Sequence, residues 1–198
     1  MEDSKKREHR VDLVLNARCS LGESPVFDKR VNVLYFVDIN SCVVHSFHID
    51  TKLHNVYQLD APVGMIGLTD DPRFLIACTE RAVLEIELDE SSSTVSQRVL
   101  AMTPEEDGVE NMRFNDGKIS PQGTLIVGRM HSKWRDGNPG RLYKLNAGDG
   151  QLKDITPPEG MGLPNGLVWT RDGSFMYLVD SCKETITKYP TNSDVSQS

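Results

Sequence analysis

Four stretches of this 198-residue chain repeat one pattern of polar and apolar positions. In each, a short polar turn precedes about six apolar, β-prone residues, and a second strand-like run follows after a few more polar positions. The first runs begin at Leu34, Phe74, Leu125 and Met176, which are 40, 51 and 51 residues apart. The second runs cover 43–49, 82–88, 140–145 and 185–190. Even spacing of short strands, with no convincing amphipathic helix between them, predicts an all-β protein.

The length of the repeat indicates which all-β architecture to expect. A period of 40 to 51 residues is typical of propeller blades, each made of four strands. An ordinary sandwich with coincidental spacing is the alternative, and the persistence of the pattern over four units favours the propeller. We expect about four blades over residues 11–190, between a charged segment (1–10) and a polar tail (191–198). The run 11–16 predicts one more strand before the first blade, and the fourth blade is expected to stop after its third strand.

Composition and charge narrow the class of protein further. The chain is 38% apolar and 26% charged, which suits one soluble domain with a sizeable core. A net charge of −7 argues against a nucleic-acid partner, and no apolar run is long enough to cross a membrane. The first ten residues show no secretory signal, so a cytoplasmic protein is expected. Four cysteines without a CxxC motif predict reduced thiols, buried where Cys42, Cys78 and Cys182 lie in apolar runs.

Three polar residues occupy equivalent places in the repeat. Glu23, Asn115 and Asn165 lie 11, 10 and 11 residues before their apolar runs, and the second unit has Val63 at this place. The first strand of each propeller blade lines the central channel, so these side chains are expected to meet at one height around the axis. Carboxylate and amide oxygens are the ligands of hard divalent cations such as Ca²⁺ and Mg²⁺. A cation would also compensate the charge of Glu23 where water is scarce.

Each of these residues also has a purely structural interpretation. Glu23 could cap a turn or pair with Arg18 at the surface. Asn115 and Asn165 stand beside or close to a glycine, and that combination is a turn signal by itself. The shared offset is the observation that favours a common site.

Three further groups of residues have alternative interpretations of the same kind. Arg113 alternates to the same strand face as Asn115, where a guanidinium suits a substrate carboxylate or ring oxygen, although an inter-blade salt bridge is an equal alternative. Asp38 and Asp180 are expected to bond to neighbouring backbone amides. The histidines at 45, 48, 54 and 131 show no metal spacing and no triad partner. The chain has no GxSxG, P-loop or dinucleotide-binding fingerprint.

Three segments together resemble a known family. They are "LGESPVFD…LYFVDI", "RFNDGKISPQGTLIVGRM" and "LPNGLVWTRDGSFMYLVDS". In content and order they are similar to the senescence marker protein (regucalcin)/gluconolactonase/luciferin-regenerating enzyme family, over about Val11 to Tyr189. The resemblance implies a six-bladed β-propeller that binds one divalent cation near its axis and hydrolyses sugar lactones and related esters. About four of the six blades are expected in this chain.

The resemblance also implies roles for individual residues. Glu23 of "GESP" and Asn165 of "NGL" match metal ligands, and Arg113 and Asn115 of "RFNDGK" match substrate-contacting residues. The metal could be Ca²⁺, Zn²⁺, Mn²⁺ or Mg²⁺. The family's remaining metal ligand, an aspartate of a "PDG" motif that also serves as the base, would fall beyond residue 198. No catalytic residue is therefore assigned within this chain.

The chain departs from the family pattern at the strand after "NDGK". Arg129 stands where many relatives have a threonine, and Lys133 stands about where they have a glutamate near the substrate. The resemblance therefore does not determine the substrate preference of this chain.

These inferences lead to one expected function and one alternative. The first is a gluconolactonase-like hydrolase with a small lactone or ester as substrate, and with weak or absent turnover because the last ligand and base are missing. The alternative is a non-catalytic propeller fragment that binds calcium or another protein. The chain could be a truncated product, pair with a second copy, or close as a four-bladed ring. Open blade edges would favour self-association, and apolar faces of the first and fourth blades would meet water.

Overall fold

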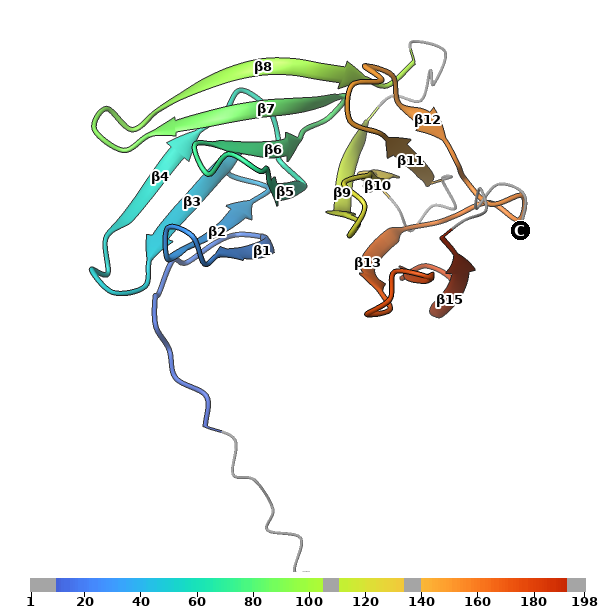
Figure 1. The fold of residues 1–198 in the computed structure, drawn as a ribbon, viewed down its shortest axis with the longest axis horizontal. Coiled ribbons are helices and arrows are strands. Elements are labelled where there is room, and N and C mark those ends of the chain that lie inside the picture. The colour runs from blue at the N-terminus through green and yellow to red at the C-terminus, as the bar shows by residue number, and fades with distance from the viewer. Residues whose placement is uncertain (1–9, 105–110, 134–139, 192–198) are drawn as a thin grey trace, which may run out of the picture.

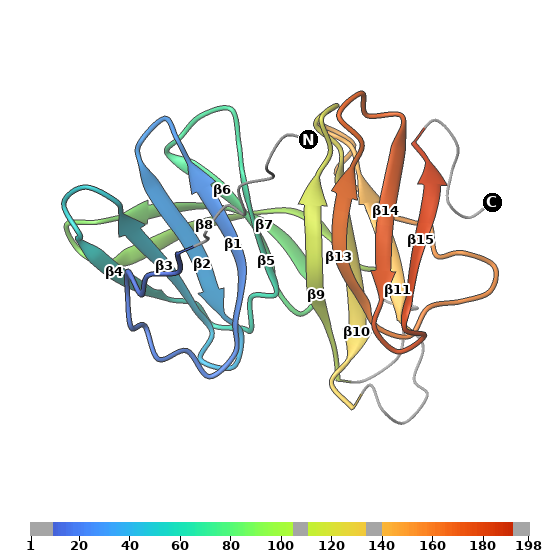
Figure 2. The ribbon, with the colours of Figure 1, turned by 90° about the horizontal axis from the view of Figure 1, so that it is seen from below.

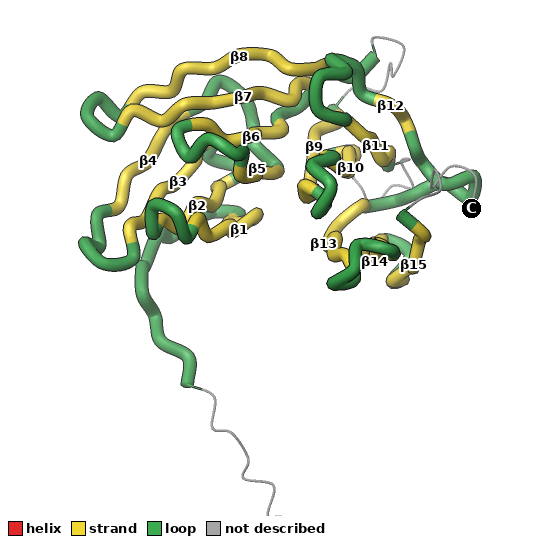
Figure 3. Tube along the Cα trace, viewed as in Figure 1, coloured by secondary structure: helices red, strands yellow, loops and turns green. Residues whose placement is uncertain are grey.

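The computed structural model describes residues 10–104, 111–133 and 140–191, which form four antiparallel sheets. The described residues contain strands and turns and no helix, as Figure 3 shows, so no apolar helix crosses a membrane within them.

The first sheet consists of β1 (Gly22–Asp28), β2 (Val33–Asp38), β3 (Val43–His48) and β4 (His54–Gln58). The second consists of β5 (Met65–Leu68), β6 (Phe74–Cys78), β7 (Ala82–Asp89) and β8 (Thr94–Met102). The third consists of β9 (Met112–Ile119), β10 (Leu125–His131), β11 (Arg141–Leu145) and β12 (Lys153–Asp154).

The fourth sheet has three strands among the described residues: β13 (Pro164–Trp169), β14 (Phe175–Asp180) and β15 (Thr185–Pro190). In every sheet, strands that are consecutive along the chain are also neighbours in space. The four sheets follow one another around an arc, with β1, β5, β9 and β13 on its inner side (Figure 1). This arrangement confirms a propeller with four blades and excludes the sandwich.

The expected strands agree closely with the observed ones because their signal is local. β2, β6, β10 and β14 coincide with the four apolar runs, and β3, β7, β11 and β15 coincide with the second runs. Polar turns at each end satisfy their backbone groups with water, while the apolar run buries both faces of a central strand.

The hydrophobic core is divided into three parts, one between each pair of neighbouring sheets. Val37 and Ile86 belong to the cluster between the first and second sheets. Phe114 joins the second sheet to the third, with its ring edge against Tyr143, and Leu178 belongs to the cluster between the third and fourth. Each blade is therefore stabilised by burial of apolar side chains against its neighbours, at roughly 25 cal/mol per Å² of apolar area.

The two end sheets each leave apolar side chains in solvent. Ile186 on β15 is 72% exposed, Val168 on β13 is more than half exposed, and Phe27 on β1 is nearly half exposed. Val168 and Ile186 lie on the face of the fourth sheet opposite Leu178, because Val168 pairs with Tyr177 and Ile186 pairs with Val179. Apolar side chains of the first and fourth blades therefore meet water, as expected.

Two expectations from the sequence are wrong. Residues 11–16 form no strand: Val11 is 94% exposed, and the segment runs away from the sheets (Figure 1). An alternating pattern needs a partner backbone, and no described strand lies beside it. None of the four cysteines forms a disulfide, but only Cys78 is buried. Cys42 and Cys182 lie in turns that follow β2 and β14 rather than in the strands, so Cys42 is half-buried and Cys182 is exposed.

Candidate active site

Three of the four inner strands carry a β-bulge at the equivalent place in the repeat. In β1 the register with β2 shifts between Glu23 and Val26, and in β13 the register with β14 shifts between Asn165 and Leu167. In β9 the shift falls at the residues that include Asn115. β5 pairs with β6 without interruption, and the corresponding Val63 is buried. Bulges bend a strand and re-aim its side chains, and they are frequent beside functional sites.

The bulge of β1 also ties the first sheet to the second. Ser24 has a positive φ of 51°, a left-handed conformation that is strained for a residue other than glycine. Its hydroxyl oxygen accepts the amide of Ile66 at 2.9 Å, and the hydroxyl lies 3.4 Å from the Ile66 carbonyl oxygen. Ser24 therefore holds the backbone next to Glu23 against β5, a role that the sequence pattern does not reveal.

Arg113 and Asn115 form a connected pair on β9. Arg113 Nη1 donates to Asn115 Oδ1 at 3.0 Å and to the Phe114 carbonyl at 2.9 Å. Asn115 Nδ2 donates in turn to the carbonyl of Pro164 at 3.0 Å, at the start of β13. Arg113 is thus not part of an inter-blade salt bridge among the described residues, and Asn115 joins the third sheet to the fourth beside Asn165.

Glu23 interacts electrostatically with Arg113 of this pair. The pKa of Arg113 is lowered by burial, and the negative charge of Glu23 partly offsets this effect. The interaction crosses from β1 to β9, so the channel brings together residues 90 positions apart in the sequence. The carboxylate of Glu23 is exposed and accepts no hydrogen bond from the described part of the chain.

Asn165 lies at the equivalent point of β13 with its amide partly engaged. Its Nδ2 donates to the hydroxyl of Ser181 at 3.2 Å, and its Oδ1 accepts the amide of Gly166 at 3.1 Å. An amide oxygen has two lone pairs, so Oδ1 retains one for a further partner. The convergence of Glu23 and Asn165 on a single cation stays a prediction from their shared position.

Asp38 and Asp180 fix the segments that lead into two of these strands. Asp38 accepts the amides of Ser20 and Leu21 at 2.8 and 2.9 Å. Asp180 accepts the amides of Gly162 and Leu163 at 2.9 and 3.0 Å. Their expected bonding to backbone amides is confirmed. Burial acts to raise the pKa of both carboxyl groups, but the backbone donors outweigh it and the pKa of each is lowered.

A cavity of about 660 Å³ lies between the inner strands. Residues of β1, β5, β9 and β13 all line it, and Figure 2 shows β9 and β13 side by side. Of the four predicted site residues, Glu23 is the one that lines this cavity; the other three precede the lining residues on their own strands. The site therefore lies where the inner strands enter the channel.

One further carboxyl group lines the cavity and is not singled out by the sequence pattern. Asp116 is half-buried, and its Oδ1 accepts the amide of Gly117 at 2.7 Å. Burial raises the pKa of Asp116, against the opposing effects of that amide and of Lys118. The "NDG" sequence by itself indicates only a turn, whereas Asp116 lies within β9. A carboxyl with a raised pKa in a cavity can hold or accept a proton.

The two departures from the family pattern, Arg129 and Lys133, have different surroundings. Arg129 is buried on β10, and its Nε donates to the carbonyl of Glu80 at 3.2 Å, which ties the third sheet to the second. Lys133 follows β10 in a turn, where its amide donates to His131 Nδ1 at 3.0 Å. Arg129 therefore serves the packing of the blades.

The oxygen donors at the channel entrance suit a hard divalent cation. Glu23 offers a carboxylate whose oxygens have no donor among the described residues, and Asn165 offers an amide oxygen. Ca²⁺ and Mg²⁺ prefer carboxylate and carbonyl oxygens. Within the described ranges, no group of three or more His, Cys, Asp or Glu side chains is arranged to hold a metal, so Glu23 and Asn165 would need additional ligands.

Comparison with known proteins shows the family to which the chain belongs. The description "SMP-30/Gluconolactonase/LRE-like region" matches residues 21–197. The chain belongs to this family. It is 28% identical over 176 residues to regucalcin of Xenopus laevis, covering 87% of this chain and 56% of that protein. It is 29% identical over 174 residues to the 6-deoxy-6-sulfogluconolactonase of Pseudomonas putida, covering 88% and 56%.

A solved structure agrees with the blade arrangement. The calcium-binding protein regucalcin from Agrobacterium tumefaciens superposes with a TM-score of 0.73 at 20% identity, over 90% of this chain and 56% of that one. The chain thus spans a little over half the length of the relatives it matches. The family is one of six-bladed propellers, and four of those blades are present here.

Proposed function

We propose that this chain provides the metal-binding and substrate-holding side of a hydrolase for sugar lactones or related esters. The observation that carries the proposal is the recurrence of a bulge at Glu23, Asn115 and Asn165, around the entrance of one cavity. The family includes a sugar lactonase, the sulfogluconolactonase, which supports this substrate class.

The residues of the chain take separate roles in the proposal. Glu23 and Asn165 would hold one divalent cation, with Ca²⁺ favoured by their oxygen donors. When bound, the cation would polarise the lactone carbonyl and stabilise the negative charge that develops on its oxygen. Arg113 would hold the sugar through guanidinium N–H groups other than those of Nη1, which already bond within β9. Asn115 would keep Arg113 and the start of β13 in place.

Turnover by this chain alone is proposed to be weak. Hydrolysis needs a group that takes a proton from water, and the aspartate that the resemblance implies for that step has no match up to residue 198. Binding and chemistry would therefore separate in this chain: Glu23, Asn165 and Arg113 would hold the cation and the sugar, while the aspartate that the resemblance implies as the base is not one of these residues.

A second function is a calcium-binding module without turnover. The observation that favours it is that, among the described residues, Glu23 is the one carboxylate at the channel entrance that accepts no hydrogen bond, which leaves a site of low charge. Such a site binds calcium weakly, because the affinity of calcium sites rises with the number of charged ligands.

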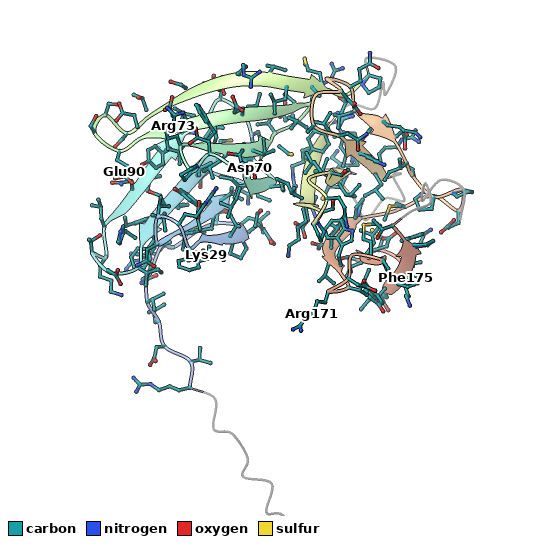
Figure 4. All side chains as sticks on the ribbon, in the orientation of Figure 1. Lys29, Asp70, Arg73, Glu90, Arg171 and Phe175 are labelled. Atoms are coloured by element: carbon teal, nitrogen blue, oxygen red, sulfur yellow. The ribbon has the colours of Figure 1, made fainter. Side chains whose placement is uncertain are left out.

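The experiment that tests both functions is a calcium titration followed by a lactone assay on the same samples. Ca²⁺, Mn²⁺ and Zn²⁺ are titrated calorimetrically into the chain and into Glu23→Gln. Glu90→Gln is the matched control, because Glu90 is exposed in the turn after β7 at the outer edge of the arc (Figure 4). Hydrolysis of glucono-1,5-lactone is then followed by acid release.

We expect one binding event that Glu23→Gln weakens at least about tenfold and Glu90→Gln leaves unchanged. Lactone hydrolysis above background that disappears in Glu23→Gln supports the hydrolase, and binding without hydrolysis supports the module. Metal binding that is the same in all three proteins contradicts both. Fast turnover lost in Glu23→Gln would show that the residues of this chain suffice for the chemistry.

A further inference from the structure

A second group of reactive side chains lies on the first sheet, outside the channel. Cys19 Sγ is 3.8 Å from His45 Nε2, and His45 Nδ1 is 2.9 Å from His54 Nε2. The three side chains therefore form a line from a thiol, through one imidazole, to a second imidazole. This is the spatial order of a nucleophile, a base and a group that orients the base.

The middle residue of this line is held firmly. His45 is 5% exposed, and the ring of Phe36 stacks on it at 4.5 Å between centroids with an interplanar angle of 5°. His54 stacks on His45 at 5.1 Å. His45 and Phe36 are cross-strand partners on β3 and β2, and His54 comes from the adjacent β4. Three strands thus fix the direction in which the imidazole of His45 points.

The cluster lies on the outward face of the first sheet. Val44, the neighbour of His45, belongs to the core between the first and second sheets, and alternate residues of a strand point to opposite faces. His45 therefore points away from the second sheet, towards the segment that leads into β1. Cys19 belongs to that segment and is half-buried, so a small reagent can reach its sulfur.

The charge states suit general-base activation rather than a preformed thiolate. Burial, with a smaller effect of Asp38, raises the pKa of the Cys19 thiol, so the thiol is the resting form. Burial and His54 lower the pKa of His45, and Asp38 acts in the opposite direction, so His45 is neutral at pH 7. A neutral imidazole with its Nδ1 hydrogen on His54 presents the lone pair of Nε2 to the thiol.

We propose that Cys19 is a modification site that forms a mixed disulfide with low-molecular-weight disulfides, with His45 as its general base and His54 orienting His45. The thiol proton moves from Sγ to His45 Nε2 while the sulfur attacks one sulfur of the disulfide. A new S–S bond forms, the old S–S bond breaks, and its electron pair leaves with the departing thiolate. That thiolate takes the proton from His45, so the balanced products are the mixed disulfide and one free thiol.

Two of the other three cysteines supply internal controls. Cys182 is exposed, and burial and Asp180 raise the pKa of its thiol, so it also rests in the protonated form. Cys78 is fully buried, so its reaction reports unfolding. Exposure alone predicts that Cys182 reacts first, whereas activation by His45 predicts that Cys19 does.

The test follows the modification of each cysteine by oxidised glutathione, using mass spectrometry of peptides from the intact chain. At pH 7 we expect Cys19 to react at least about tenfold faster than Cys182, because general-base assistance contributes about a hundredfold or more and the greater exposure of Cys182 offsets part of that advantage. His45→Gln should lower the Cys19 rate by a similar factor and leave Cys182 unchanged. His54→Gln should have a smaller effect in the same direction. Cys19→Ser and Cys182→Ser verify the assignment of each peptide.

The pH dependence of the wild-type chain tests the base without any substitution. The titratable groups that face His45 are Cys19, His54 and Asp38. The Cys19 rate should rise as the pH passes the lowered pKa of His45, become nearly constant around neutrality, and rise again only when the thiol ionises. The Cys182 rate should increase about tenfold per pH unit throughout that range, as expected of a thiol that reacts after its own ionisation.

Two results would overturn the proposal. One is a Cys19 rate equal to or below that of Cys182 at pH 7. The other is a Cys19 rate that rises about tenfold per pH unit through neutrality, as for simple thiol ionisation. If His45→Gln exposes Cys78 to the reagent, the variant is unfolded, and the wild-type pH profile then decides. None of these measurements involves a metal or a lactone, so their outcome is independent of the proposed hydrolase function.

Discussion

The carboxylate of Asp38 accepts the backbone amide of Leu21 at 2.9 Å, and this contact recurs three sheets later between Asp180 and Leu163 at 3.0 Å. The amides of Ile39 and Ser181 also donate to the carbonyls of Leu21 and Leu163, both at 3.0 Å. Leu21 and Leu163 stand two residues before Glu23 and Asn165. The same pair of bonds therefore sets the height at which both predicted metal ligands enter the channel.

Replacing Asp38 by Asn should destabilise the chain. Oδ1 of Asp38 accepts the amide of Leu21, and Oδ2 accepts both the amide of Ser20 and the hydroxyl of Ser41. In the Asn variant one of these oxygens becomes an NH₂ group, which must then face a hydrogen-bond donor. Asp38 is 4% exposed, and water cannot easily replace the lost acceptor. We expect the free energy of unfolding in urea at pH 7 to fall by about 1–3 kcal/mol. Asp60→Asn, at an exposed turn position, is the control and should have little effect.

At acid pH the wild-type chain should also lose the contribution of the ionised Asp38 carboxylate to its free energy of unfolding. Because the pKa of Asp38 is lowered in the folded state, its stabilising effect is fully present above the unfolded pKa of about 3.9 and is lost as the pH falls through the folded pKa. The difference in unfolding free energy between wild type and Asp38→Asn should therefore narrow below about pH 4. A difference that stays constant down to about pH 2 would contradict the role of the ionised carboxylate.

Asp116→Asn should stabilise the chain at pH 7, whereas Asp38→Asn should destabilise it. Burial raises the pKa of Asp116, so the stability associated with its protonated form is present below the unfolded pKa and is lost as the pH rises through the folded pKa. Asn keeps an oxygen that accepts the amide of Gly117 and carries no charge. The variant should unfold at a higher temperature than wild type at pH 7, and the two should approach each other near pH 3. A lower melting temperature at pH 7 would be evidence against a desolvated carboxylate.

Much of the fold, and less of the site, can be predicted from the sequence. The strands beginning at Leu34 and Phe74 follow from residues within each segment, and so does the recurrence of Glu23 and Asn165. The bulge at Ser24 depends on the register between β1 and β2, which the local pattern does not specify. The contact between two histidines on β3 and β4 likewise arises across strands. For residues 11–16 the local pattern predicts too much: it indicates a strand, but no described strand pairs with this segment.

Gly64→Ala tests the close approach of the second and third sheets. A Cβ at Gly64 would lie 2.1 Å from the carbonyl oxygen of Phe114, which is backbone and cannot move aside. We expect a loss of at least about 1–3 kcal/mol in unfolding free energy, together with a shift of the β9 segment that carries Arg113. Gly67→Ala is the matched control on the same sheet, because its Cβ would meet only the ends of the Ile119 and Met65 side chains at 3.0 Å. Equal stability of the two variants would contradict a steric clash with the β9 backbone as the cause.

The outward face of the fourth sheet is expected to drive self-association. Val168 and Ile186 lie exposed on that face, and β15 is the last strand of its sheet among the described residues, so apolar area and unpaired backbone groups occur together. Phe175 lies on the same face, partly covered by the ammonium of Lys188 at 3.7 Å from its ring (Figure 4). Sedimentation velocity over a range of protein concentrations should show a reversible increase in mass.

Ile186→Lys should reduce that association, because a charge on the exposed face repels a second copy and must be desolvated at any apolar contact. Thr185→Lys adds the same charge to the same strand on the opposite face and is the matched control. The reduction should be larger for Ile186→Lys than for Thr185→Lys and should persist at high salt, where purely electrostatic repulsion is screened. If the two variants weaken association equally, net charge is responsible, and the apolar face of the fourth sheet is not the contact.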